Sequence, residues 1–323
     1  MRIGIVHDDL DGIGCAVVLK VCVNVDKIVF ASPHNIDRVL AEWIGRAERI
    51  YVADIGINPG TLDRVLKIVE KARDVGTQVI WIDHHRWDTE WIDKLRSLGV
   101  ELYVDRSTCA AGLCLSKLCS DASRDLKAFI DDVCSVDLWR FSTPLSPYIY
   151  RYAMYRDSER WRSKCIEVFL KVVEKSYRSI LNVVEPIVEK YIDRELKVLS
   201  SIEKTIRVIN VCGRSIALYF RHSDIPNQSL VGNRILSLGY DIAILVSKRG
   251  ASLSLRSRTV DVSKLARYLG GGGHERAAGA PLKINPFIRL LYRVPFIRRI
   301  AENIILSKLS KILADACRDG VLS

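Results

Sequence analysis

The sequence has no uninterrupted apolar run of 18 residues, and three acidic residues fall within its first eleven positions. The missing apolar run argues against a membrane-spanning helix. The early acidic residues argue against a secretory signal, which needs an apolar segment there. We therefore expect a soluble, cytoplasmic protein.

The sequence also lacks closely spaced cysteine pairs and has few residues with side-chain amides. The nine cysteines contain no C-x-x-C pair, which excludes a common zinc pattern, and their odd number does not fit a simple disulfide framework. We expect them to be mainly buried small apolar side chains. Only two glutamines and nine asparagines are present, which favours a thermophilic source. In such a protein Cys109, Cys114 or Cys119 could pair with another cysteine.

The length, composition and net charge of the chain predict a globular protein with an anionic partner. A chain of 323 residues predicts about two domains, and 49% hydrophobic with 27% charged residues excludes a disordered or fibrous chain. Lys and Arg exceed Asp and Glu by 11, which favours a nucleotide, a nucleic acid or an acidic membrane surface as partner. Nearly half of this excess lies in residues 283–323, which hold eight basic and three acidic residues.

The first half of the chain alternates short apolar runs with amphipathic stretches. Strands are expected at residues 2–6, 27–31, 49–53, 78–82 and 100–104. Helices are expected between and after them, at about 13–23, 35–46, 61–74, 88–98 and 108–120. This alternation predicts a doubly wound α/β domain with a mainly parallel sheet.

The second half predicts a helical connection, a smaller α/β domain and a tail. Residues 125–204 are mostly helical, with Pro186 as an expected interruption. We predict a first domain at 1–180, a connecting helix at 181–204, a second domain at 205–282 and a tail at 283–323. The pattern of the tail predicts basic amphipathic helices that are broken at Pro286 and Pro295. It could pack on its own protein or on a homodimer mate, contact RNA, or lie on a membrane surface.

Acidic and imidazole side chains follow three of the predicted strands. His7, Asp9 and Asp11 follow the first, Asp54 the third, and Asp83-His84-His85 the fourth. Ligands of open α/β sheets bind at the carboxyl ends of the strands, so these residues are expected to converge. Carboxylates at that density would repel one another unless a cation lies among them.

The ligand types favour manganese or magnesium, because carboxylates and imidazoles occur without a thiolate. Two neighbouring ions need a shared carboxylate, and Asp54 is the natural bridge. We expect His7 and Asp9 to bind one ion and Asp11 and His84 the other.

These motifs resemble, in order and spacing, the first three motifs of the DHH phosphoesterase superfamily. Residues 253–280, LSLRSRTVDVSKLARYLGGGGHERAAGA, resemble the signature of its DHH-associated substrate-binding domain, of the RecJ-like and nano-RNase type. The resemblance implies a fourth metal motif, for which Asp137 matches better than Asp131 or Asp132. It also implies two manganese ions and in-line attack on phosphorus by a water that bridges them.

The resemblance assigns further roles. Asp83 is expected to orient His84, and His85 to touch the substrate phosphate or the leaving group. The expected substrate contacts of the second domain are Arg256, Ser257, Gly271, Gly272, Gly273 and His274. The glycine run would bring backbone N–H groups close to a phosphate, the alternative being a flexible linker.

The resemblance therefore implies a manganese-dependent phosphodiesterase that converts short oligonucleotides, or cyclic or linear dinucleotides, to mononucleotides. The alternatives are a RecJ-type single-strand exonuclease, a phosphatase acting on 3'-phosphoadenosine 5'-phosphate or polyphosphate, and a non-catalytic nucleic-acid-binding protein. A RecJ-type enzyme usually carries an added nucleic-acid-binding domain, for which this length leaves only the tail.

Overall fold

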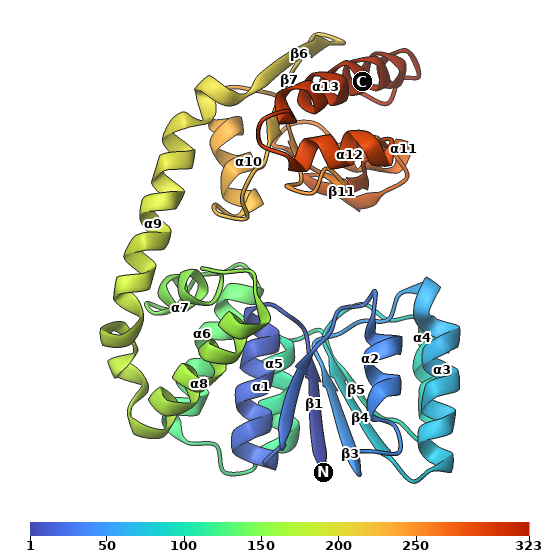
Figure 1. Cartoon of the computed structure of the whole chain (residues 1–323), viewed down its shortest axis with the longest axis vertical. Coiled ribbons are helices and arrows are strands. Elements are labelled where there is room, and N and C mark those ends of the chain that lie inside the picture. Colours follow the sequence, from blue (N-terminus) through green and yellow to red (C-terminus); the bar gives the residue numbers. More distant parts are fainter. Residues whose placement is uncertain (323) are drawn as a thin grey trace. The chain divides into compact units, whose positions relative to one another are not determined.

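The computed structural model describes residues 1–322, which form two compact units that divide between Lys190 and Tyr191 (Figure 1). Helix α9 (Ile180–Thr205) contains the boundary between them. No helix among the described residues is long and apolar enough to cross a membrane.

A five-stranded parallel sheet forms the centre of the first unit, in the order β2-β1-β3-β4-β5. Its strands are β1 (Arg2–Val6), β2 (Lys27–Phe30), β3 (Arg49–Ala53), β4 (Gln78–Asp83) and β5 (Glu101–Val104). Residues two apart on a strand face the same side, and the buried pairs Ile3 and Ile5, Val52 and Ile50, and Trp81 and Val79 build one core. The expected doubly wound fold is confirmed.

Helices cover both faces of this sheet (Figure 1). Helices α2 (Ile36–Trp43), α3 (Pro59–Asp74) and α4 (Thr89–Ser97) contribute to that core, while α1 (Leu10–Val23) and α5 (Ala110–Leu118) lie on the other face. Helix α3 starts with proline at its first position, where no backbone donor is needed.

Four further helices complete the first unit and lead out of it. They are α6 (Arg124–Asp137), α7 (Ser146–Ala153), α8 (Glu159–Lys175) and α9. The expected interruption at Pro186 is wrong, because α9 continues through it. Buried Ile180, Val184 and Val188 lie one turn apart around the proline, so packing of this stripe holds the helix despite the lost hydrogen bond.

The second unit contains a six-stranded mixed sheet in the order β10-β11-β9-β8-β7-β6. Its strands are β6 (Arg207–Val211), β7 (Arg214–Phe220), β8 (Ile242–Val246), β9 (Ser252–Ser257), β10 (Gly272–His274) and β11 (Ala277–Pro281). Within the described part of this second sheet, β7 and β8 pair in parallel and the other neighbouring strands are antiparallel. Helix α10 (Gln228–Ser237) packs on one face, and α11 (Val262–Tyr268) on the other.

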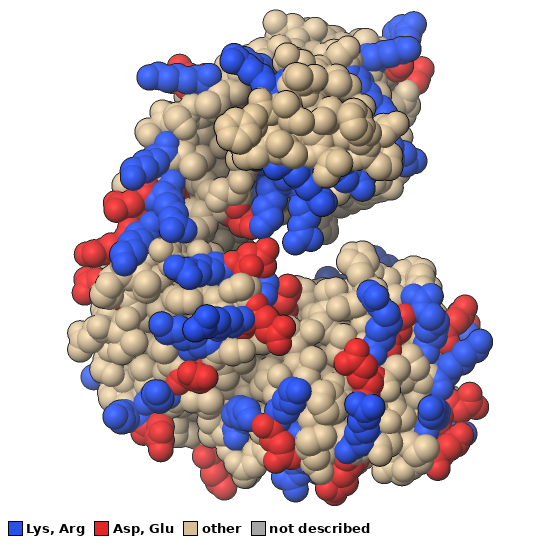
Figure 2. All heavy atoms as spheres, viewed as in Figure 1, with Lys and Arg blue, Asp and Glu red and all other residues tan. Residues whose placement is uncertain are grey.

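The tail forms α12 (Pro286–Arg293) and α13 (Arg298–Arg318), which join the core of the second unit. Buried Ile305, Leu309 and Leu313 recur every fourth residue and pack in the same cluster as the sheet residues Leu218 and Ile244. Several large apolar side chains of the tail are nevertheless exposed, among them Phe287, Leu290, Phe296 and Ile300, and Figure 2 shows an uncharged patch on this part of the second unit.

Six of the nine cysteines form disulfides, so the expectation of mainly free, buried thiols is wrong. The pairs are Cys22–Cys119, Cys109–Cys134 and Cys212–Cys317, with Cys15, Cys114 and Cys165 buried and unpaired. Of the three cysteines that were candidates for pairing, Cys109 and Cys119 are paired and Cys114 is not. The partners lie 97, 25 and 105 residues apart, so only the fold brings them together.

Candidate metal centre

Three strand ends bring the acidic and imidazole motifs to one edge of the parallel sheet. The register aligns Val6 with Ala53 and Ala53 with Ile82, so the residues after them start from one level. His7 and Asp54 directly follow β1 and β3, and His84 directly follows β4. Residues more than 70 positions apart in the sequence thereby form one side-chain cluster.

The turn from β1 into α1 positions the first motif. Asp9 is the residue that caps α1, and its Oδ1 accepts a hydrogen bond of 3.1 Å from the backbone N–H of Gly12. Gly12 packs so closely that an added Cβ would lie 2.1 Å from the carbonyl oxygen of His7. The absence of a side chain at position 12 therefore permits the close approach between α1 and the end of β1.

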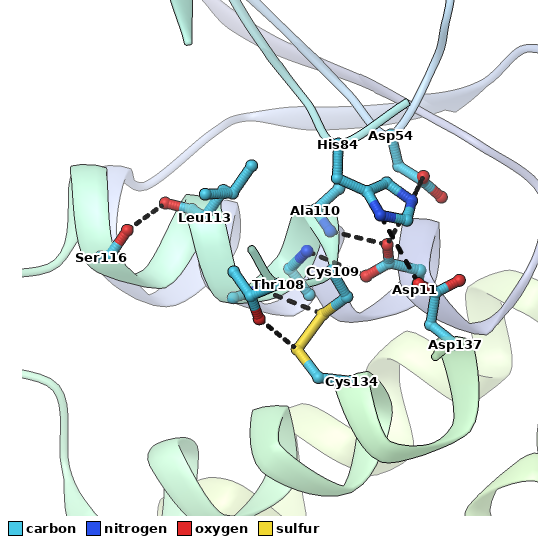
Figure 3. Close-up of a disulfide and its surroundings, with 12 residues drawn as sticks. Asp11, Asp54, His84, Thr108, Cys109, Ala110, Leu113, Ser116, Cys134 and Asp137 are labelled. Atoms are coloured by element: carbon cyan, nitrogen blue, oxygen red, sulfur yellow. Dashed lines mark hydrogen bonds and ion pairs between the residues drawn. A yellow bond between two sulfur atoms is a disulfide. The ribbon is translucent and has the colours of Figure 1, made fainter. Parts of the chain in front are cut away.

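The buried Asp11 is held by the start of α5 (Figure 3). Its two carboxylate oxygens accept backbone hydrogen bonds of 2.8 Å from Ala110 and 2.9 Å from Ala111. Burial and the negative charges of Asp137 and Asp9 nevertheless raise the pKa of Asp11 well above its usual value. A cation near Asp11 would remove this cost of its ionisation.

Asp54 lies at the centre of the cluster in a left-handed backbone conformation, with φ of 61°. Aspartate tolerates this region better than most residues, and such conformations concentrate at functional sites. The carboxylate is buried, its Oδ1 lies 3.5 Å from His84 Nε2, and its Oδ2 lies 3.7 Å from His7 Nδ1. Burial and the charges of Asp9 and Asp11 raise the pKa of Asp54 well above its usual value.

His84 connects this carboxylate with two others. Its Nε2 lies 3.7 Å from Asp11 Oδ2, and its Nδ1 lies 3.7 Å from Asp137 Oδ2 (Figure 3). Asp137 ends α6, and burial and the charge of Asp9 raise its pKa although His84 lowers it. The other two candidates for the fourth motif lie outside this cluster. Asp131 is exposed, and Asp132 accepts a hydrogen bond from the hydroxyl of Tyr177.

His7 and Asp9 form a close pair on the other side of Asp54. His7 Nδ1 lies 2.8 Å from Asp9 Oδ2. Burial alone lowers the pKa of His7, but the hydrogen bond and charge of Asp9 outweigh it and raise the pKa to about 8. Burial likewise opposes ionisation of Asp9, yet the His7 imidazole holds the pKa of that carboxyl well below its usual range.

The donor set fits divalent ions. His7, Asp9 and Asp54 each offer one ligand atom within 4.8 Å of the others, and so do Asp11, His84 and Asp137. The buried oxygens Asp54 Oδ2 and Asp137 Oδ2 accept no hydrogen bond, which leaves lone pairs available for a cation. Carboxylates with imidazoles and no thiolate suit manganese or magnesium.

A third group of ligand atoms at the same spacing joins Asp54, His84 and His85. The sequence predicts that His85 contacts the substrate, but it does not indicate that His85 lies this close to Asp54 and His84. Side chains of consecutive residues in an extended chain point in opposite directions, so only the turn after β4 brings both rings near Asp54.

Asp83 contacts His85, whereas the sequence predicts that it orients His84. The fully buried Asp83 accepts a hydrogen bond of 2.8 Å from His85 Nδ1 and one of 2.5 Å from Trp87 Nε1. This fixes the His85 ring with its Nε2 turned away from Asp83, while the His85 side chain stays about half exposed, at 52%. His84 instead lies 3.5 to 3.7 Å from Asp54, Asp11 and Asp137.

The disulfide Cys109–Cys134 braces two helices of the centre (Figure 3). Cys109 caps α5, whose first N–H groups hold Asp11, and Cys134 lies in α6, one turn before Asp137. Replacing both cysteines by serine is expected to weaken manganese binding about tenfold, as loss of supporting contacts does in metal sites. We expect the free energy of unfolding to fall by roughly 3 kcal/mol.

Calorimetric manganese titration and chemical unfolding of this double variant provide the test. Cys22→Ser with Cys119→Ser is a matched control, since that disulfide joins the far ends of α1 and α5. The control should lose stability but keep the manganese affinity. Equal manganese affinity in both double variants and in the native chain would contradict a bracing role for Cys109–Cys134.

The glycine run of the second unit is ordered and contains β10, so it is not a flexible linker. An added Cβ would lie 2.1 Å from Gly279 O at Gly271 and 2.5 Å from Ala278 Cα at Gly273, where φ is 139°. These two glycines are therefore required by the pairing of β10 with β11. Gly272 has open space around it, and both it and His274 are exposed.

Arg256 and Ser257 end β9 in different environments. Arg256 is partly buried, its guanidinium lies 3.4 Å from the hydroxyl of Ser229, and burial lowers its pKa. The buried Ser257 hydroxyl donates to Asp241 O at 2.7 Å and accepts from the N–H groups of Thr259 and Val260. Ser257 thus shapes the loop after β9, and this geometry does not support its predicted substrate contact.

Known proteins resemble this chain in sequence and in fold. No family model matches the sequence. The oligoribonuclease NrnB of Bacillus subtilis is 23% identical over 302 residues, covering 85% of this chain and 71% of NrnB.

Two solved structures share the fold. The pGpG-specific phosphodiesterase PggH of Vibrio cholerae aligns with 95% of this chain and 98% of its own, at TM-score 0.54 and 16% identity. RecJ of Thermus thermophilus, solved with Mn2+, aligns with 95% of this chain and 52% of its own, at TM-score 0.57 and 13% identity.

These similarities extend over both units, and the motif residues after β1, β3 and β4 meet in one cluster with Asp137. Their order along the chain is that of the motifs quoted above. The sequence similarity to NrnB and the fold shared with PggH and RecJ agree with the resemblance to the DHH phosphoesterase superfamily.

Proposed function

We propose that this protein is a manganese-dependent phosphodiesterase that hydrolyses short oligonucleotides or dinucleotides to mononucleotides. The observation that carries the proposal is the pair of ligand groups centred on Asp54 and His84, which together contain His7, Asp9, Asp11 and Asp137. The sequence similarity to an oligoribonuclease and the shared fold of a dinucleotide phosphodiesterase support the substrate class.

The six residues would hold two divalent ions, with Asp54 between them. Bound manganese would supply positive charge for the phosphoryl oxygens and would make a water more acidic. Magnesium is the alternative ion, since it accepts the same oxygen ligands. The buried N–H contacts to Asp11 and the cap at Asp9 hold the ligand carboxylates in place before any substrate arrives.

His85 is the residue of the first unit that we assign to the substrate. Because its Nδ1 donates to Asp83, a proton on Nε2 points away from that carboxylate and can be donated to a phosphate oxygen or to the leaving oxygen. The carboxylate of Asp83 raises the pKa of His85, which favours the form with both nitrogens protonated.

The second unit contributes the remaining proposed contacts. Arg256 has no carboxylate partner among residues 1–322, so a bidentate phosphate would compensate its partly desolvated charge. Gly272 and His274 are exposed and could donate hydrogen bonds to a phosphate or sugar. Gly271 and Gly273 act through the strand geometry that places them there.

A substrate panel under one manganese concentration tests the proposal. The panel contains RNA and DNA of two to five nucleotides, a linear and a cyclic dinucleotide, a 30-nucleotide single strand, 3'-phosphoadenosine 5'-phosphate and polyphosphate. We expect mononucleotide release to be fastest from the shortest phosphodiesters. Preference for the long strand would favour a RecJ-type exonuclease, and preference for the last two compounds a phosphatase. Failure on every compound with manganese bound would favour a non-catalytic nucleic-acid-binding protein.

We place this activity in the cytoplasm. Three disulfides are compatible with that location if the source is a thermophile, because intracellular proteins of hyperthermophiles are rich in disulfides. The scarcity of glutamine points to the same source.

A further inference from the structure

A second candidate binding site lies in the second unit, at the β6 edge of the six-stranded sheet. A cavity of about 440 Å³ opens between the end of α9, strands β6 and β7, and the start of α13. It is lined by Lys204, Thr205, Arg207, Tyr219, Phe220, His222, Pro295, Arg298, Arg299 and Glu302. The glycine run containing β10 is at the opposite edge of the sheet, so this cavity is separate from the proposed substrate contacts.

Positive charge dominates the cavity wall. Lys204, Arg207, Arg298 and Arg299 have no carboxylate partner within residues 1–322, although Arg298 Nε donates a hydrogen bond of 2.9 Å to the carbonyl oxygen of Tyr292. The single lining carboxylate, Glu302, lies 2.7 Å from His222 Nε2 and is thereby engaged.

Four unpaired cations around one cavity repel one another, and an anion between them would turn this repulsion into attraction. Arginine fits phosphate especially well, because its planar guanidinium can donate two parallel hydrogen bonds. Three of the four cations are arginines: Arg207, Arg298 and Arg299.

The cavity volume falls within the range of small-molecule sites. Buried Phe220 and partly buried Tyr219 give it an apolar floor beside the charges. An RNA backbone would instead need a continuous basic groove. We propose that this cavity binds a small anion that carries two or more phosphoryl groups, such as a nucleoside polyphosphate, independently of the metal centre.

Calorimetric titration of the full-length chain without added divalent metal tests the proposal. The probes are ATP, inorganic tripolyphosphate, and adenosine as the uncharged comparison, at 150 mM sodium chloride. The variant Arg207→Glu with Arg299→Glu reverses two charges of the cavity. Lys264→Glu with Arg249→Glu reverses two exposed charges elsewhere in the same unit. Arg256→Ala removes a cation assigned to the substrate.

We expect ATP and tripolyphosphate to bind, with a dissociation constant raised at least tenfold by the cavity variant and unchanged in the other two. Adenosine should not bind measurably. A loss shared equally by both charge-reversal variants would show a general effect of net charge and would overturn the proposal. A loss of affinity confined to Arg256→Ala would also overturn the proposal. The same holds if the native chain binds neither ATP nor tripolyphosphate. Circular dichroism of each variant verifies that the chain is folded.

Discussion

Replacing Asp54 by asparagine is expected to lower the rate of mononucleotide release by more than about a hundredfold, because the variant loses the carboxylate that lies between the two groups, grouped with His7 and Asp9 and 3.5 Å from His84. Asparagine has the same shape and also tolerates the left-handed conformation at φ of 61°, so the backbone should not change. The effect is therefore attributable to the charge. Release of mononucleotides from a trinucleotide in manganese measures it.

The metal-free Asp54→Asn protein should be at least as stable as the native chain. The pKa of Asp54 is raised by burial and by neighbouring carboxylates, so removal of its charge relieves an unfavourable interaction. Manganese should raise the melting temperature of the native chain, because it binds only the folded state, and should have little effect on the variant. Asp131→Asn, at an exposed position of α6, is the matched control and should behave as the native chain. Undiminished activity of Asp54→Asn would refute the assignment of the centre.

Replacing Gly12 by alanine should also reduce the rate by about a hundredfold, since a misplacement of about 1 Å at a catalytic site has effects of this order. The added Cβ would lie 2.1 Å from the carbonyl oxygen of His7, and this backbone atom cannot move without shifting the end of β1. His7, Asp9 and Asp11 would all be displaced. Glycine-to-alanine changes inside helices normally stabilise by up to about 1 kcal/mol, so a loss of stability here would identify the clash.

Gly60→Ala is the matched control for this prediction. Gly60 lies in the first turn of α3, and a Cβ at that position has no heavy atom within 4 Å. Both variants are compared by chemical unfolding and by manganese-dependent activity. Native activity in Gly12→Ala would mean that α1 can move away from β1 without disturbing the centre.

The order of strands and helices in the first unit was predictable, because parallel α/β units leave a local pattern. Each strand is a short run of β-branched residues, and each helix an amphipathic stretch of distinct period. The position of His7, Asp54 and His84 directly after such runs was equally visible. Since parallel strands end at one edge, their convergence followed without any coordinates.

Features that depend on distant packing were not predictable. The α9 helix continues through Pro186 because Val184 and Val188 are buried beside it. The sequence left open whether the tail packs on its own protein, on a partner or on a membrane surface, and only the structure places Ile305 and Leu309 in the core of the second unit. Local sequence reports propensity, and packing energy outweighs it at these sites.

The sequence by itself predicted the doubly wound first domain and the acidic and imidazole residues that gather at the ends of its strands. Only the tertiary structure decided which residues touch: Asp83 with His85, Asp11 with the start of α5, and Cys109 with Cys134. The physical reason is the range of the forces involved. Strand ends and side-chain periodicity arise from neighbouring residues, whereas hydrogen bonds and disulfides form wherever the folded chain brings two groups within about 3 Å.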